Sequence, residues 1–153
     1  MGGQLTHHGS FANTPRYSTQ PVAGFFVEGE PKPQGSMRSV GKGRMIPDNP
    51  HMKKWRDHVQ AQAAQVWGGK DPLDQPVEVH AVFWLPRPKK PRFSVPATGY
   101  DTDKLARAVG DALERGGVLR NDARITTWIA DKRYATETDP AGVHITIRTK
   151  EAA

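Results

Sequence analysis

Apolar residues recur at three- and four-residue spacing in two stretches of the chain, which predicts two amphipathic helices. The first is expected to begin at Asn49-Pro50, a favourable N-cap and first helical residue, and to end near Gly68-Gly69. The second is expected from Thr102 or Asp103 to about Arg115, before Gly116-Gly117. Their predicted buried faces are Met52, Trp55, Val59, Ala63 and Val66 in the first helix, and Leu105, Ala108, Val109, Ala112 and Leu113 in the second.

Four other segments have the short apolar or alternating patterns of strands. They are residues 24–29, 77–85, 125–130 with a continuation through Lys132 and Tyr134, and 142–148. The order strand, helix, strand, helix, strand, strand predicts an α+β fold. We expect one mixed sheet with both helices packed on one face, and the other face free for a partner or a second subunit. Residues 24–150 are expected to form this domain, and residues 1–23 a flexible tail.

The charge balance favours a polyanionic partner. The 153 residues include 22 Lys and Arg against 16 Asp and Glu, a formal net charge of +6. No cysteine is present, which excludes disulfides, thiolate metal sites and cysteine catalysis. No apolar run reaches the roughly 20 residues that cross a bilayer, and the N-terminus has no signal-peptide pattern. A cytoplasmic protein without a membrane partner is expected.

Two loops punctuated by Gly and Pro carry most of the candidate contacts to a phosphate backbone. Their cationic residues are Lys32, Arg38, Lys42 and Arg44 in the first loop, and Arg87, Lys89, Lys90 and Arg92 in the second.

Acidic residues cluster around the start of the second helix, inside this basic chain. Asp101 and Asp103 flank one residue and can face one ion, and Asp122 follows the Gly-Gly turn, which could return it to the helix. All-oxygen ligation suits Mg²⁺ or Mn²⁺, which can activate water beside a phosphate. Arg107 and Lys132 are candidate cations for the developing charge.

Each of these residues also has an ordinary structural interpretation. Asp and Thr before an apolar helical run commonly cap the helix. Asp111 can pair with Arg107 or Arg115, four residues away on either side. Asn121-Asp122 can be a turn, and Lys132 an exposed strand residue.

The whole pattern is more specific than its parts. Asp-x-Asp-x-Leu-x-Arg-Ala-x-x-Asp-Ala-Leu, seven residues, Asn-Asp-Ala-x-Ile and Lys132 together resemble the RusA family of Holliday-junction resolvases. The resemblance is strongest over residues 99–132 and extends more loosely over 24–149, including the stretch Gly-Glu-Pro-Lys-Pro-Gln-Gly-Ser-Met-Arg that begins at Gly29.

The resemblance implies a homodimeric, Mg²⁺-dependent endonuclease that resolves four-way DNA junctions by paired nicks in recombination and repair. The family is common in phages and prophages, which implies the host cytoplasm as the location. The essential acids of the family map to Asp101, Asp103 and Asp122, and Asp111 matches a further recurrent acid. Arg107 replaces a lysine of the family, Asn121 replaces the first acid of its Asp-Asp pair, and Lys132 matches a later basic position.

Two other functions stay open at this point. Arg107 and Asn121 also suit a non-catalytic protein that binds branched DNA. A nuclease of the same family could instead act on flaps, forks or RNA.

Overall fold

A computed structural model describes residues 16–17, 21–35, 37–39, 45–47 and 50–151. Within them, strands β1 (Arg16–Tyr17) and β2 (Ala23–Glu28) precede a short hairpin of β3 (Met37–Ser39) and β4 (Met45–Pro47). The chain continues through α2 (Pro50–Trp67), β5 (Val77–Leu85), α3 (Thr102–Arg115), the short 3₁₀ helix η1 (Asp122–Arg124), β6 (Ile125–Tyr134) and β7 (Gly142–Glu151).

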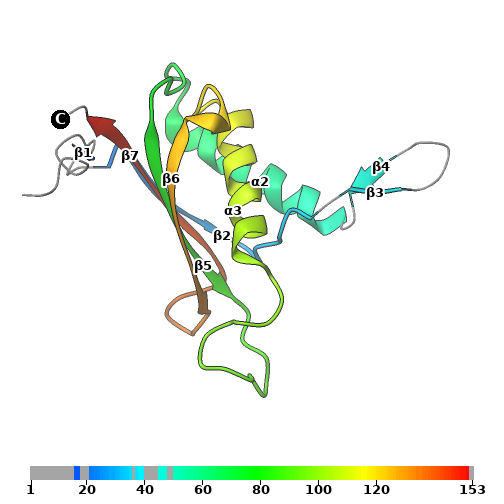
Figure 1. Ribbon diagram of the computed structural model, residues 1–153. Helices are drawn as coiled ribbons and strands as arrows, with labels where there is room; N and C mark the ends of the chain where they lie inside the picture. Colours follow the sequence, from blue (N-terminus) through cyan, green and yellow to red (C-terminus); the bar gives the residue numbers. More distant parts are fainter. Residues whose placement is uncertain (1–15, 18–20, 36, 40–44, 48–49, 152–153) are drawn as a thin grey trace, which may run out of the picture.

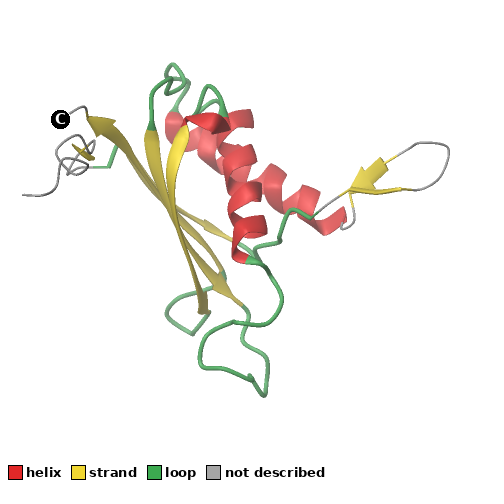
Figure 2. Ribbon diagram, viewed as in Figure 1, coloured by secondary structure: helices red, strands yellow, loops and turns green. Residues whose placement is uncertain are grey.

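The main sheet is mixed, as expected. Strand β7 lies between β5 on one side and β2 on the other, and all of these pairs are antiparallel. Strand β6 pairs with the free edge of β5 in parallel, so α3 is the crossover connection of a β5–α3–β6 unit. The loops that follow β5 and β6 therefore leave the same end of the sheet, beside the start of α3 (Figure 2).

Both helices cover one face of this sheet (Figure 1), which confirms the predicted α+β arrangement. Every residue of the predicted apolar stripe of α3 is fully buried. The stripe packs against alternate residues of the two central strands, namely Val77, Val79, Ala81, Phe83 and Leu85 of β5 with Val143, Ile145 and Ile147 of β7.

One predicted core position of α2 is wrong. Val66 is 47% exposed, and Trp67 is buried in its place. The step from Ala63 to Trp67 is four residues, which keeps the same side of the helix as the step from Val59 to Ala63. The indole N–H of Trp67 donates to the carbonyl of Asp71 at 3.2 Å, so the large ring is buried without losing its polar partner.

Two short strand pairs were not predicted. Strand β1, inside the segment expected to be a flexible tail, pairs with the end of β7. The hairpin of β3 and β4 interrupts the segment expected to be a loop, and it stands out from the sheet and helices (Figure 1). Both are two- or three-residue pairings, too short for periodicity to reveal. No helix in the described part of the chain is long and apolar enough to cross a membrane.

Candidate active site

A hollow of about 600 Å³ lies between α3 and β6. It brings together residues that the sequence places far apart, including Asp103 and Arg107 of α3 and Asp122 of η1. Its other lining residues are Thr102, Ala106, Gly110, Ile125, Trp128 and Ala130. Two carboxylates and one guanidinium therefore share an open space whose floor is apolar.

The packing of α3 on β6 gives the hollow its shape. A Cβ atom on Gly110 would lie 3.3 Å from the indole of Trp128, so the absence of a side chain lets the ring lie close to the helix. Asp103 and Arg107 are one helical turn apart on the exposed side of α3. Their side chains and Trp128 line the same space.

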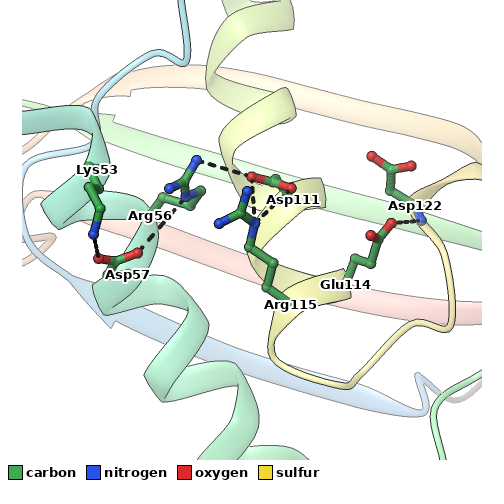
Figure 3. A network of polar contacts seen from close by, with 7 residues as sticks. All are labelled: Lys53, Arg56, Asp57, Asp111, Glu114, Arg115 and Asp122. Atoms are coloured by element: carbon green, nitrogen blue, oxygen red, sulfur yellow. Dashed lines mark hydrogen bonds and ion pairs between the residues drawn. The ribbon is translucent and has the colours of Figure 1, made fainter. Parts of the chain in front are cut away.

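The turn after α3 returns Asp122 to this hollow. Gly117, at φ +80°, ends the helix in the left-handed conformation, and Leu119 then forms a parallel bridge with Leu73. The side chain of Glu114 accepts the backbone N–H of Asp122 at 2.7 Å. Figure 3 shows the Asp122 carboxylate turned away from Glu114, so the backbone is held while the carboxylate stays available.

Asn121 has a structural function in this turn. Its side-chain oxygen accepts the backbone N–H of Ala123 at 2.8 Å and caps η1. The residue that replaces an acid of the family pattern is therefore engaged with the backbone in this structure. Aspartate could make the same cap.

We expect Asn121→Ala to lower the free energy of unfolding by about 1 kcal/mol, the usual loss for an N-cap, and to lower the activity of the site because Asp122 is less well positioned. Asn121→Asp should keep both properties close to wild type. Urea unfolding and activity measurements on the two variants test this. Unchanged stability in Asn121→Ala would contradict the capping role.

Asp101 lies at the N-cap of α3 but does not cap with its side chain. Its carbonyl accepts the N–H groups of Lys104 and Leu105, whereas its carboxylate makes no capping hydrogen bond. The carboxylate is 62% exposed and lies 3.5 Å from the Lys104 ammonium. The capping interpretation therefore fails for this side chain, which leaves it available for another partner.

The three predicted metal ligands do not line one common site in the structure. Asp103 and Asp122 line the hollow and Asp101 does not. Among the described residues, no cluster of three or more acidic or histidine side chains is arranged to hold a metal ion.

The donor chemistry of the two carboxylates nevertheless suits a hard divalent cation. Mg²⁺ commonly keeps several waters and binds through one or two carboxylates plus a substrate phosphate. Asp103 and Asp122 supply such oxygens from two elements, on an open surface where a phosphate can enter. The Asp101 carboxylate makes no cap bond that would hold it at the start of α3.

Lys132 is not among the residues that line the hollow. Its ammonium donates to the backbone carbonyls of Tyr100 at 3.1 Å and Gly99 at 3.4 Å. Both residues have positive φ, +50° for Tyr100 and +66° for Gly99. Tyr100 is the only non-glycine residue with positive φ within the described ranges. Lys132 thus braces an unfavourable turn directly before Asp101.

The same turn is held from the other side by the segment after β2. The Tyr100 hydroxyl donates to Glu30 Oε2 at 3.1 Å, and the Lys32 ammonium forms an ion pair with the same carboxylate. That hydrogen bond to Lys32 lowers the pKa of Glu30 and raises the pKa of Lys32. Burial, reinforced by the Glu30 charge, raises the pKa of Tyr100, so its hydroxyl stays a donor. Lys32, a predicted DNA contact, therefore already has an ion-pair partner in Glu30.

Asp111 reaches helix α2 instead of the hollow. Its carboxylate lies 3.2 Å from Arg56 Nη1 of α2 and 3.2 Å from Arg115 Nε (Figure 3). The side chains of Arg56 and Asp111 are only 11% and 21% exposed, and Arg56 Nε is buried without a hydrogen bond in the described part of the chain. The predicted surface pairing of Asp111 with Arg115 exists, and the contact with Arg56 adds a link between the helices.

Of the remaining predicted DNA contacts, four lie on a described loop and the side chains of three are not described. Arg87, Lys89, Lys90 and Arg92 are exposed on the long loop after β5. Lys42 and Arg44 lie outside the described residues, as does the side chain of Arg38.

Sequence reasoning missed Glu30, Arg56, Tyr100 and Glu114 as supports of the site. No periodicity distinguishes them, because each acts through a contact to a distant segment. Arg56 stands among the charged residues Lys53, Lys54 and Asp57 of α2, so its own charge was no signal, whereas the Gly99-Tyr100 pair before a helix was the signal for a special turn.

A comparison with models of known protein families gave a match to Endodeoxyribonuclease RusA over residues 28–148. The matched range includes every residue assigned above to the hollow and its supports. No curated protein matches this chain.

Proposed function

Because the chain belongs to the RusA family of endodeoxyribonucleases, enzymes that resolve Holliday junctions, we propose that it cuts four-way DNA junctions by a pair of symmetric nicks that depend on Mg²⁺. The observation that carries the proposal is the shared hollow of Asp103, Asp122 and Arg107. Mn²⁺ is a possible substitute, since it prefers the same ligands.

Asp103 and Asp122 would hold the metal ion, with Asp101 as the third ligand. When bound, such an ion activates water and neutralises charge on the scissile phosphate. The fold of the chain positions the two carboxylates. Helix α3 fixes Asp103, and the capped turn fixes Asp122 through Glu114 and Asn121. Hydrolysis would leave a 5′-phosphate and a 3′-hydroxyl.

Arg107 is the cation of the hollow and would bind the phosphate as its negative charge increases. A guanidinium can hold two phosphate oxygens at once but cannot release its proton near neutral pH. We therefore assign it electrostatic stabilisation and not proton transfer. Lys132 would position Asp101 through the bonded carbonyls of Gly99 and Tyr100 instead of contacting the phosphate.

The open face of the sheet supports the proposed homodimer. Phe26 and Ile129 expose 39% and 43% of their surface there, on the side away from the helices, and the ring of Trp84 packs edge-on against Phe26. A two-fold dimer would present two sites to two symmetry-related strands. The exposed basic loop after β5 would contact the DNA backbone without reading its sequence, so affinity should fall steeply with salt. We also propose a cytoplasmic location for the enzyme, that of the host if a phage encodes it, because a DNA substrate is available there.

One cleavage assay tests this function. The purified chain is incubated with end-labelled four-way junction, flap, fork, linear duplex and RNA of matched sequence, with Mg²⁺, Mn²⁺ or EDTA. We expect paired nicks at symmetric positions of the junction, only with a divalent metal, and at least ten-fold slower cleavage of the other substrates.

The other outcomes separate the alternatives. Junction that is retarded but intact in every metal would replace the nuclease by a branched-DNA-binding protein, for which Arg107 in place of lysine is the favouring feature. Faster cutting of flaps, forks or RNA would keep the chemistry and replace the substrate.

A further inference from the structure

We propose that a second hollow, next to the active site, binds one unpaired nucleobase of the branched DNA. It has a volume of about 330 Å³, and Tyr100 and Tyr134 are among its walls. The other lining residues are Leu85, Pro86, Arg87, Pro88, Pro96 and Thr98. The inference rests on the proposed function and names the part of the substrate that this surface holds.

Residues that line this hollow are adjacent in the chain to residues of the candidate active site. Tyr100 directly precedes Asp101, and Lys132, which bonds to the Tyr100 carbonyl, lies two residues before Tyr134 on β6. The hollow lies where the loops after β5 and β6 leave the sheet beside the start of α3 (Figure 2). A nucleotide in it would therefore be close in the strand to a phosphate at Asp103 and Asp122.

Tyr100 is held through its side chain and backbone, and Tyr134 through its backbone, before any ligand arrives. Tyr100 is anchored through its hydroxyl to Glu30 and through its backbone to Lys132. Tyr134 is the last residue of β6 and pairs with Leu85, and the next N–H, that of Ala135, donates to the Leu85 carbonyl at 2.8 Å. Rigid aromatic walls lose little conformational entropy on binding, which favours them as a stacking surface.

The chemistry of the lining favours a base of a nucleic acid over other occupants. Aromatic rings and prolines offer apolar area for a planar base, and Arg87 adds a cation that suits the attached phosphate. The basic residues Lys89, Lys90 and Arg92 follow on the same exposed loop. Bases at a branch point are the ones that lose least stacking when they leave the helix, so a junction supplies such a base at low cost.

The test is a double-mutant cycle that combines a substitution in the protein with an abasic site in the DNA. The affinity of wild type and Tyr134→Ala is measured in EDTA, without cleavage, for an intact junction and for junctions with an abasic site at each position around the branch. In wild type, we expect one abasic position to weaken binding roughly 5- to 150-fold, the range spanned by stacking one base on an aromatic ring. Tyr134→Ala should weaken binding to the intact junction similarly, with no further loss from that abasic site.

Two further variants distinguish the loss of base binding from a loss of folding. Tyr134→Phe should behave as wild type, and Thr98→Trp, a substitution at an exposed position that fills the hollow, should abolish the sensitivity to the abasic site. Additive losses in the cycle, or no sensitive position in wild type, would overturn the base-binding hollow while leaving the nuclease in place. A wild-type chain that neither binds nor cuts any junction would overturn the proposed function and this inference together.

Discussion

Replacing Asp103 or Asp122 with Asn is expected to lower the rate of junction cleavage by roughly 10²- to 10³-fold, the usual loss when one group that stabilises the transition state is removed. Both side chains are exposed, so the folded state should be unaffected within about 0.5 kcal/mol. Junction affinity in EDTA should also stay close to wild type. Single-turnover cleavage with Mg²⁺ and gel retardation measure the two properties.

Asp71→Asn is the matched control, because Asp71 is an exposed acid whose described contact uses its backbone carbonyl. It should cut at the wild-type rate. Asp101→Asn decides how many carboxylates act: a loss as large as that of Asp103→Asn requires Asp101 to turn away from Lys104 in the working enzyme. An Asp103→Asn protein that cuts at the wild-type rate would refute the assigned site.

Replacing Asp111 with Ala is expected to lower the free energy of unfolding by about 1–3 kcal/mol, because the charged and poorly exposed Arg56 loses its partner. The cleavage rate per folded molecule should change little, since Asp111 points toward α2 and does not line the hollow. Urea unfolding gives the stability, and activity normalised to the folded fraction gives the rate.

Arg115→Ala serves as the control for this prediction. Its side chain is 50% exposed, and the loss of such a surface pair costs about 0–1 kcal/mol. A stable but inactive Asp111→Ala protein would instead make Asp111 part of the catalytic machinery.

The elements of this fold could be predicted from the sequence because helical and strand periodicities are local properties. The boundaries of α3 and the burial of Leu105, Val109 and Leu113 follow from the spacing of apolar residues within one helix. The same reasoning failed at Val66, where two adjacent apolar residues compete for one buried position and only the packed core selects Trp67. Pairings as short as β1 with β7 carry no periodic signal at all.

Some features of the candidate site could likewise be predicted from the sequence, and others could not. The amino-acid order alone specifies which acids stand near the start of α3, how Arg107 is spaced from them, and the family to which the pattern belongs. What each side chain contacts depends on the tertiary structure. Asp122 lines the same hollow as Asp103 because of the turn after α3, and Asp111 meets Arg56 across 55 residues because the two helices pack together. Such contacts depend on how elements pack and on strand register, which no local spacing encodes.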